Sequence, residues 1–363
     1  MKMIKVCIIG CGMIAKSAHI PAYQAYPQDF EITAVCDFAE AVAKKTAEEN
    51  HIGHYYSDAE EMLKTEKPDV VSVCAPNMLH KEYTMLALSY GANVLCEKPL
   101  AITYQDAKEM FDFAKAQGKV LMACQSLRFL PERVRARELI QNGEAGKIYY
   151  GEVSRVRHRG IPTWGKFHLK EFSGGGALID IGVHGIDSAI WLMNNPKPKT
   201  VSATMNKVHT DEIGDPKAAG ALKDNVTGNA FDPQEMNVES FATGMIRFEN
   251  DATLMFKVAW AANLKEENNI VLSGEKAGFN LEEQTVYDRE DSAHSLEVAA
   301  NGFQDEPFFG HFCLVKNMAD VLLRNGKPAV LPEETLNVTA VIEAAYRSAS
   351  TGKEIDMGEY FHD

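Results

Sequence analysis

Two short segments of the chain carry side chains suited to proton chemistry on a hydroxyl group. The first is Cys96-Glu97-Lys98-Pro99, in which Lys98 follows an apolar run. Pro99 disfavours helical backbone at Lys98, so the predicted strand ends there. An ammonium group at the carboxyl end of a parallel strand can hold a ligand hydroxyl and stabilise a developing alkoxide. The same tetrapeptide in isolation is more typical of a surface lysine.

The second segment is Asp180-Ile181-Gly182-Val183-His184, which follows the glycines Gly174–Gly176. If this segment is helical, Asp180 and His184 lie one turn apart on the same face, and Asp187 follows three positions later. A histidine with carboxylates beside it is a natural proton acceptor near neutral pH. The alternative is an aspartate that caps the helix and a histidine satisfied within the fold. We expect no metal site, because no second histidine or cysteine follows at ligand spacing.

A glycine-rich segment near the N-terminus suits the binding of a dinucleotide. Gly10-Cys11-Gly12-Met13-Ile14-Ala15 has the GxGxxA pattern between a predicted strand and a predicted helix. Gly10 permits a tight turn, Gly12 lets the backbone approach a pyrophosphate, and Ala15 lets helix and strand pack closely. The N-terminus of the helix then offers N–H groups and a partial positive charge to the phosphates.

An acidic residue lies where such a site needs one. Asp37 ends the second predicted strand, 25 positions after Gly12, near the usual spacing of about 20. Its carboxylate can accept hydrogen bonds from the adenosine ribose and would repel a 2′-phosphate. Phe38, Ala39 and Glu40 follow, with no basic residue among them, so we expect NAD rather than NADP. The alternative is an aspartate at a strand-to-turn junction that binds no ligand.

The first third of the chain supplies the elements that would position these residues. Apolar β-rich runs alternate with helical patterns, which is typical of parallel βαβ units. The runs are continuously hydrophobic, which indicates strands buried on both faces. We predict a dinucleotide-binding domain over residues 1–124. Its predicted strands are Ile4–Ile9, Glu31–Cys36, Val70–Cys74, Asn93–Cys96 and Val120–Cys124, and its predicted helices are Met13–Tyr26, Ala39–Asn50, His80–Tyr90 and Tyr104–Gln117.

The pattern changes after residue 124 to strand-like runs with few helices between them. This predicts a second, α+β domain with a largely antiparallel sheet over residues 125–363, with the last helices free to pack back on the first domain. Residues 209–236 are polar and rich in Gly, Asp and Asn, and we interpret them as a long surface loop. The predicted strands are Ile148–Arg157, Thr200–Val208, Glu239–Phe248, Thr253–Trp260 and Asn269–Ser273, and the predicted helices are Pro131–Gln141, Gly176–Met193, His311–Arg324 and Glu333–Ser350.

Composition limits the possible partners and locations of the protein. A net charge of −14 argues against binding to nucleic acid or to an anionic membrane, both of which need a basic surface. The apolar runs are too short to span a bilayer. The seven cysteines are odd in number, lie mostly in or beside predicted buried strands and show no CxxC spacing. They indicate reduced thiols, and we expect a cytoplasmic protein.

The motifs in this order resemble the Gfo/Idh/MocA family of dehydrogenases, which includes glucose–fructose oxidoreductase and inositol dehydrogenase. The resemblance covers essentially the whole chain. It rests on Gly10–Ala15, Asp37, Ala75–His80, Glu97–Pro99, Arg128-Phe129, Gly174–Gly176 with Asp180 and His184, and Ala344–Ala349 before Gly352-Lys353.

The resemblance implies an N-terminal Rossmann domain and a C-terminal α+β domain with an open sheet that forms a homodimer or homotetramer. It also implies NAD as cofactor and a small polyol, sugar or glycoside as substrate. Lys98, Asp180 and His184 would form the catalytic set, with His184 accepting the hydroxyl proton. The implied cofactor-binding residues are Gly10, Cys11, Gly12, Met13, Ile14, Asp37, Ala75, Pro76, Asn77, His80, Glu97 and Lys98.

The segment Arg157–Gly165 resembles a subgroup associated with oxidation of sugars and glycosides. By that resemblance it would lie near the substrate, where Trp164 could stack on a pyranose ring. Arg157 or Arg159 would bind hydroxyls or a carboxylate. The implied substrate-binding residues are Arg128, Arg157, Arg159, Trp164, Asp180 and His184.

Two other functions remain open at this stage. One is a glycoside hydrolase that oxidises its substrate, eliminates the leaving group and re-reduces the product with the same bound NAD. The other is a non-enzymatic NAD and sugar sensor, which is disfavoured because Lys98, Asp180 and His184 are all present. Net production of NADH would distinguish a dehydrogenase from either alternative.

Overall fold

The computed structural model describes residues 3–162, 165–210, 232–290, 292–298 and 306–361. The chain forms two compact units. The first comprises Met1–Ser126 and Gly302–Thr335, and the second comprises Leu127–Asn301 and Leu336–Asp363. The segment that contains helix α9 (Phe309–Arg324) therefore belongs to the first unit, although it follows the second along the chain.

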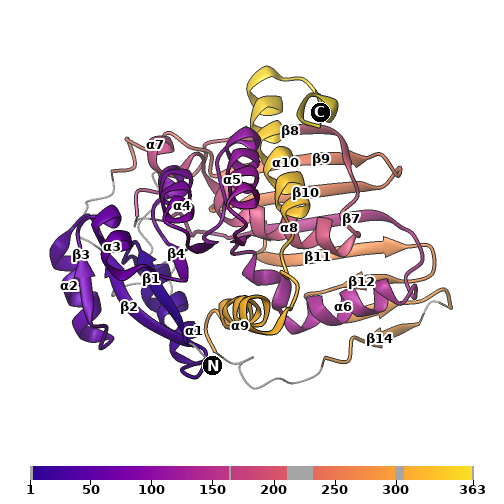
Figure 1. Cartoon of the computed structure of the whole chain (residues 1–363). Helices are drawn as coiled ribbons and strands as arrows, with labels where there is room; N and C mark the ends of the chain where they lie inside the picture. The colour runs from indigo at the N-terminus through magenta and orange to yellow at the C-terminus, as the bar shows by residue number, and fades with distance from the viewer. Residues whose placement is uncertain (1–2, 163–164, 211–231, 291, 299–305, 362–363) are drawn as a thin grey trace. The chain divides into compact units, whose positions relative to one another are not determined.

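The first unit is built on a parallel sheet of six strands in the order β3-β2-β1-β4-β5-β6 (Figure 1). This confirms the predicted α/β fold, because the strand order is that of a doubly wound dinucleotide-binding sheet. The strand order reverses between β1 and β4, since β2 and β3 lie on one side of β1 and β4 to β6 on the other, and ligands bind at such a switch point. The strands are β1 (Ile4–Ile9), β2 (Phe30–Cys36), β3 (His54–Tyr56), β4 (Val70–Val73), β5 (Asn93–Cys96) and β6 (Leu121–Ala123).

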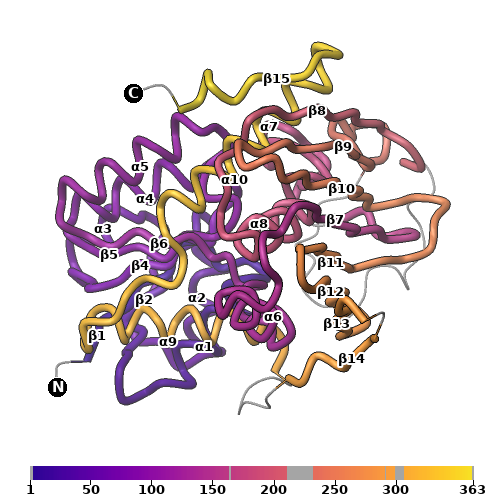
Figure 2. Tube along the Cα trace, turned by 90° about the vertical axis from the view of Figure 1, so that its right-hand side faces the viewer, coloured from indigo at the N-terminus to yellow at the C-terminus, as the bar shows by residue number. Residues whose placement is uncertain are grey.

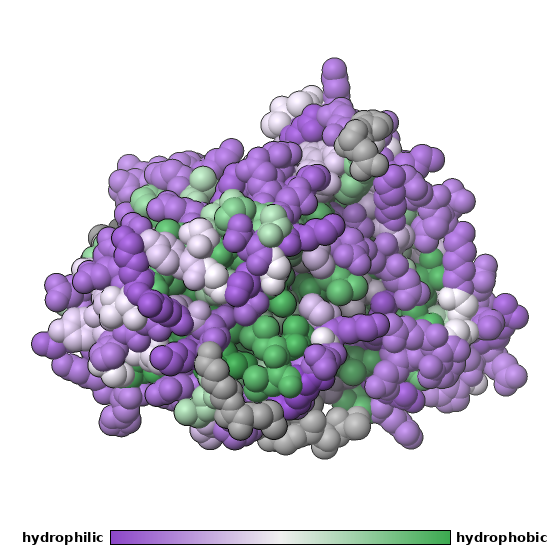
Figure 3. All heavy atoms as spheres, in the orientation of Figure 1, coloured by the Kyte–Doolittle hydropathy of each residue, from purple (hydrophilic) through white to green (hydrophobic). Residues whose placement is uncertain are grey.

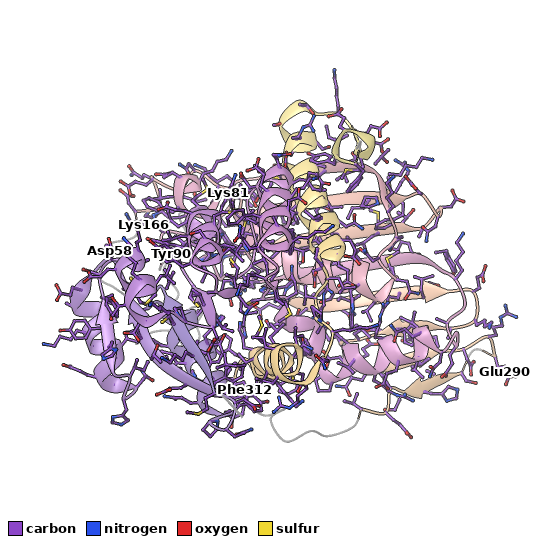
Figure 4. The ribbon with its side chains drawn as sticks, viewed as in Figure 1. Asp58, Lys81, Tyr90, Lys166, Glu290 and Phe312 are labelled. Atoms are coloured by element: carbon purple, nitrogen blue, oxygen red, sulfur yellow. The ribbon has the colours of Figure 1, made fainter. Side chains whose placement is uncertain are left out.

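Short polar side chains, Asp58 and Thr103, cap the starts of two helices of this unit, α3 and α5. Asp58 accepts a hydrogen bond from the backbone N–H of Glu61 at the start of α3 (2.8 Å), and Figure 4 shows it at that helix. Lys81 of α4 bridges to Asp106 of α5 over 2.5 Å. The helices are α1 (Ile20–Gln24), α2 (Glu40–Glu49), α3 (Ala59–Glu66), α4 (His80–Ser89), α5 (Tyr104–Ala116) and α9.

The helix that follows the glycine loop is not regular. It begins with a π-helical turn η1 (Ala15–His19) and continues as α1. Pro21, which has no backbone N–H to donate, lies just after this change in helix type. A helix is thus found where one was predicted over Met13–Tyr26, but residues Ala15–His19 form π-helical rather than α-helical hydrogen bonds.

The second unit is built on a mixed sheet of nine strands, which Figure 2 shows following one another in the order β14-β13-β12-β11-β7-β10-β9-β8-β15. Among the strands that the structure describes in this sheet, β7 and β10 pair in parallel and the other pairs are antiparallel, so the predicted, largely antiparallel sheet is confirmed. The strands are β7 (Ile148–Val156), β8 (Pro198–Asn206), β9 (Phe241–Phe248), β10 (Thr253–Ala259), β11 (Glu267–Gly274), β12 (Gly278–Asn280), β13 (Thr285–Tyr287), β14 (Ala293–Ser295) and β15 (Ile355–Asp356).

Helices cover one face of this sheet. In Figure 1, α6 (Pro131–Gln141) and α8 (Val183–Leu192) lie in front of the strands. Val153, Leu254 and Phe256 of β7 and β10 are at most 1% exposed. Other segments of the unit are α7 (Lys170–Ser173), η4 (Leu178–Gly182) and η6 (Met357–Tyr360), whereas η3 (Ser126–Phe129) and α10 (Pro332–Thr351) begin in the first unit and continue into the second.

Hydrophilic residues form most of the outer edge of the face shown in Figure 3. Among the residues that the structure describes, no helix is both long enough and apolar enough to cross a membrane. The predicted surface loop over residues 209–236 falls mostly outside the described residues.

Candidate active site

The turn after β1 has the geometry that its glycines predict. Gly10 has φ +92°, and a Cβ there would lie 2.6 Å from the carbonyl oxygen of Cys74, so only glycine fits. A Cβ at Gly12 would meet no atom within 4 Å, and Gly12 itself is exposed. The backbone at Gly12 is therefore open to a ligand, which fits a pyrophosphate. Met13 and Ile14 follow and are partly exposed.

Asp37 is held beside this turn. Its Oδ2 accepts a hydrogen bond from the backbone N–H of Cys11 (3.0 Å), and its Oδ1 accepts one from the N–H of Ala39 (3.0 Å). The carboxylate is partly exposed and keeps further lone pairs, so it can still accept a hydrogen bond from a ribose hydroxyl. The thiol of Cys11 is buried, and burial raises its pKa to about 12. Cys11 therefore serves the site through its backbone.

A histidine, His80, links the segment after β4 to the segment after β5 through hydrogen bonds of its ring. His80 is 1% exposed, and its two ring nitrogens lie 2.7 Å from the carbonyl oxygen of Pro99 and 2.9 Å from that of Ala75. Both nitrogens are thus used within the protein, and His80 acts on a ligand only by positioning its neighbours. Pro76 and Asn77 are the residues of this turn with more exposure.

Glu97 and Lys98 follow β5 and differ in their surroundings. The Glu97 side chain is buried and receives hydrogen bonds from two histidines, His19 and His311, each over 2.9 Å. Lys98 is partly exposed and is joined to Pro99 by a cis peptide bond. The first unit thus brings the predicted cofactor residues to the carboxyl ends of β1, β2, β4 and β5.

In the second unit, Asp180 lies on the π-helical turn η4 and His184 on α8, which continues it. The two residues are therefore four positions apart across a widened helical turn, a geometry frequent at functional sites. The predicted helix is confirmed, and its first part is π-helical rather than α-helical. Both side chains are partly exposed.

A buried carboxylate caps the start of this helix. Glu239 accepts hydrogen bonds from the backbone N–H groups of Gly176 and Leu178, each over 2.9 Å, and from the hydroxyl of Tyr346 over 2.8 Å. A Cβ at Gly176 would overlap the carbonyl oxygen of Glu239, and one at Gly175 would overlap the hydroxyl of Tyr346. These glycines are needed because the cap approaches the helix closely.

Asp180 is anchored from the sheet. The indole N–H of Trp260, which is fully buried just after β10, donates a hydrogen bond to Oδ2 of Asp180 over 2.9 Å. This bond fixes the carboxylate on the side of η4 that faces the end of β10.

Arg155, which was not among the predicted site residues, packs against Gly185, the residue that follows His184. A Cβ at Gly185 would lie 2.5 Å from Val153 and 3.2 Å from Cδ of Arg155. The side chain of Arg155 therefore packs against α8 at Gly185, where the missing side chain makes room for it. The Arg155 Nη1 is buried with no hydrogen-bond partner among the described residues. Burial, together with the positive charges of Arg133 and Arg157, lowers the pKa of Arg155 to about 9. A buried arginine with an unused donor is a natural binder of ligand oxygen atoms.

Arg128 lies in a different environment from the one predicted. Its guanidinium is 2% exposed and forms a two-pronged ion pair with Asp187, with Nε–Oδ2 2.8 Å and Nη2–Oδ1 2.6 Å. This pair joins η3 to α8. The geometry is that of a structural link, not of an exposed ligand contact.

The segment after β7 carries the remaining predicted substrate residues. Arg157 donates to the carbonyl oxygen of Gly160 (3.1 Å), and Arg159 donates to the side chain of Asn263 (2.9 Å). Both arginines are partly exposed. Trp164 lies outside the described residues. Lys98 belongs to the first unit, whereas Asp180, His184 and these arginines belong to the second.

The glycine turn, the placement of Asp37 and the strand order define the first unit as a dinucleotide-binding domain of the doubly wound type. Comparison with known proteins agrees. Residues 4–125 match an oxidoreductase family with an NAD-binding Rossmann fold, and residues 134–280 match the GFO/IDH/MocA C-terminal domain. The chain belongs to the Gfo/Idh/MocA family of oxidoreductases, and its first unit is the NAD-binding domain of that family.

Several relatives match over much of their length. D-glucoside 3-dehydrogenase of Escherichia coli (strain K12) is 33% identical to this chain over 98% of the chain and 97% of the relative. The scyllo-inositol 2-dehydrogenase (NADP(+)) IolU of Bacillus subtilis (strain 168) is 32% identical over 54% of the chain and 60% of the relative. An oxidoreductase from Agrobacterium radiobacter, solved with NAD+, L-tartaric acid and magnesium, shares the fold with a TM-score of 0.77 at 20% identity over 99% of both chains.

Proposed function

We propose that the protein is an NAD-dependent dehydrogenase that oxidises a secondary hydroxyl of a sugar, glycoside or cyclitol, with glucosides as the first class to test. The observation that carries the proposal is the match along nearly the whole chain to D-glucoside 3-dehydrogenase. The presence of Lys98, Asp180 and His184 in this chain supports it, because these residue types suit removal of a hydroxyl proton.

Each of the three residues has a distinct role in this proposal. The His184 imidazole accepts the proton of the substrate hydroxyl, and the Lys98 ammonium holds the same oxygen and stabilises its developing negative charge. Asp180, anchored by Trp260, orients the substrate and the imidazole. When bound, NAD supplies the acceptor for the hydride that leaves the carbinol carbon.

The preference for NAD over NADP is part of the proposal. The carboxylate of Asp37 would repel a 2′-phosphate, and its two hydrogen bonds to backbone N–H groups keep it at the turn. The next residue, Phe38, is 90% exposed and offers no positive charge to a phosphate.

We propose Arg155 and Arg157 as substrate contacts, together with Arg159 and Trp164 of the following segment. Arg155 has the strongest support because its buried Nη1 has no hydrogen-bond partner among the described residues. Arginine only donates hydrogen bonds, so it would bind the hydroxyl or ring oxygens of a sugar as acceptors. We assign Arg128 to the support of α8, because its guanidinium is committed to Asp187.

We further propose that the protein acts in the cytoplasm as a homodimer or homotetramer formed through the sheet of the second unit. Cys7, Cys11, Cys36, Cys74, Cys96 and Cys124 are free and buried, which suits a reducing compartment. Light scattering during size-exclusion chromatography would give the oligomeric state, and a monomer at micromolar concentration would contradict this part of the proposal.

The experiment that tests the function measures NADH formation by the purified protein with NAD and a panel of glucosides, inositols and free sugars. Replacement His184→Asn should lower kcat by about 10²–10⁴-fold, the usual contribution of a general base. His54→Asn, a change at a histidine whose side chain is 63% exposed, is the matched control and should leave kcat unchanged. Cleavage of a glycoside without net NADH would instead favour the hydrolase that recycles its cofactor.

A further inference from the structure

A network of buried polar groups surrounds Glu97 in the first unit. Glu97 Oε1 lies 2.9 Å from Nε2 of His19 and 2.9 Å from Nε2 of His311. None of the three residues is more than 5% exposed. His311 comes from α9, the helix that carries Phe312 in Figure 4, so a segment late in the chain reaches the end of β5 within this unit.

The direction of the hydrogen bonds follows from the chemistry of the partners. A carboxylate only accepts, so both Nε2 atoms donate to Glu97. Burial lowers the pKa of His19, which favours its neutral form. Its Nδ1 must then accept from the hydroxyl of Ser72 (3.1 Å), and the hydroxyl of Tyr23 donates to Ser72 (2.8 Å). The chain of donors from Tyr23 therefore ends on the Glu97 carboxylate.

The donors keep the carboxylate ionised. Burial alone would raise the pKa of Glu97, but the hydrogen bonds from His19 and His311 hold it well below its usual value. Burying a charge costs several kcal/mol even after relaxation, and a neutral glutamine could satisfy the same two imidazoles without that cost. A purely structural role does not explain why the group at this position is charged.

The Glu97 carboxylate lies at the end of the sheet where the nicotinamide half of the cofactor is expected. The Glu97 N–H donates to the carbonyl oxygen of Val73 at the end of β4 (2.9 Å), and Glu97 Oε2 accepts from the N–H of Lys98 (3.1 Å). In a doubly wound sheet of this order, the nicotinamide half of the cofactor lies over the β4–β6 side of the switch point. The nicotinamide ring is positively charged in NAD+ and neutral in NADH.

We propose that the Glu97 carboxylate, held by His19 and His311, is an electrostatic element of the cofactor site that favours bound NAD+ over bound NADH. A fixed negative charge attracts the oxidised ring and leaves the neutral reduced ring unaffected. The site therefore holds the oxidised cofactor more tightly than it otherwise would, while its affinity for the reduced cofactor is unchanged. The inference rests on the NAD-binding domain and does not depend on which substrate the enzyme oxidises.

A metal ion is the competing explanation for this cluster. Donor atoms of His19, Glu97 and Cys124 all lie within 4.8 Å of one another and are buried. However, Nε2 of His19 and Nε2 of His311 both lie at hydrogen-bonding distance from the same oxygen of Glu97, so these two nitrogens are committed to the carboxylate.

The test compares the dissociation constants of NAD+ and NADH by calorimetry in the wild type and in Glu97→Gln. We expect the ratio Kd(NADH)/Kd(NAD+) to fall about tenfold in Glu97→Gln, because only the affinity for the charged ring is lost. Glu97→Asp keeps the charge and should keep most of the ratio. Glu66→Gln is the matched control. Glu66, the last residue of α3, is also bonded to a histidine, His54 of β3 (2.6 Å), but this pair lies on the adenosine side of the sheet.

Three results would overturn the proposal. The first is an equal loss of affinity for both cofactors in Glu97→Gln, which would indicate a structural role. The second is the same change of ratio in Glu66→Gln. The third is stoichiometric zinc in the purified protein by elemental analysis. If Glu97→Gln does not fold, the double variant Glu97→Gln/His19→Gln replaces both groups by amides that can hydrogen-bond to each other. The ratio Kd(NADH)/Kd(NAD+) is then measured in this double variant.

Discussion

Replacement of Gly176 by alanine tests how the catalytic helix is positioned. The new Cβ would overlap the carbonyl oxygen of Glu239 and lie 2.9 Å from its carbonyl carbon. Backbone atoms cannot rotate away, so the start of η4 or the chain at Glu239 must move by about 1 Å or more to restore ordinary contact. Such overpacking costs about 1–3 kcal/mol, and it also strains the hydrogen bonds from Gly176 and Leu178 to Glu239.

The consequence for catalysis should exceed the consequence for stability. Asp180 lies four residues after Gly176 and donates its backbone N–H to the Gly176 carbonyl oxygen over 3.0 Å. A displacement of about 1 Å at a catalytic group can lower the rate about 10²-fold. We therefore expect kcat to fall about 10²-fold in Gly176→Ala, with a decrease in Tm of a few degrees for the second unit.

The assay combines steady-state NADH formation with thermal unfolding followed by circular dichroism. Gly53→Ala is the matched control, because the new Cβ would meet its nearest atom only at 3.9 Å, an ordinary contact. It should leave both kcat and Tm near the wild-type values. A Gly176→Ala variant with wild-type kcat would refute the reasoning that the cap by Glu239 sets the position of Asp180.

Three other predictions follow from the same structure. Asp37→Ser should lower the preference for NAD over NADP at least about tenfold in kcat/KM, because the charge that repels the 2′-phosphate is lost; an unchanged ratio would remove Asp37 from ribose recognition. Arg128→Met should destabilise the fold by about 3–5 kcal/mol, since it leaves the carboxylate of Asp187 buried without its partner. The double change Arg128→Met/Asp187→Leu should recover most of that loss in urea unfolding, and failure to recover would show that the ion pair is not the cause. Burial lowers the pKa of His19, so the unfolded chain binds more protons than the folded one below about pH 6.5, and Tm should fall as the pH drops from 7 to 5; a flat Tm profile would contradict a buried, neutral imidazole at His19.

Most of the fold was predictable because its signals are local. The continuously apolar runs gave β1, β5 and the other central strands, and Asn142-Gly143 marks the end of α6. The missed elements of the first unit are β3 (His54–Tyr56) and α3 (Ala59–Glu66), and the short strands β12, β13, β14 and β15 of the second unit were missed as well. The first is an edge strand with two exposed residues out of three, so it has no apolar run to reveal it.

The residues of the candidate site could be predicted only where they belong to a short sequence motif. The turn at Gly10 and the carboxylate of Asp37 follow from local chain geometry. Glu239, Trp260 and Arg155 were not selected, because each acts through a neighbour far away in the chain. Trp260 lies 80 positions from Asp180, to which it donates. The only local hint was Gly185, a glycine within a helix, whose missing side chain makes room for Arg155.

The central claim is that the protein moves a hydride from a carbinol carbon to NAD, and isotope transfer tests it most directly. The purified protein would be incubated with NAD and a methyl glucoside that carries deuterium on every ring carbon, and the reduced cofactor would be analysed by mass spectrometry. The account predicts NADH that contains one deuterium, and loss of this product in Lys98→Met. Bound NAD without any deuterated NADH, across glucosides, free sugars and deuterated inositols, would contradict it.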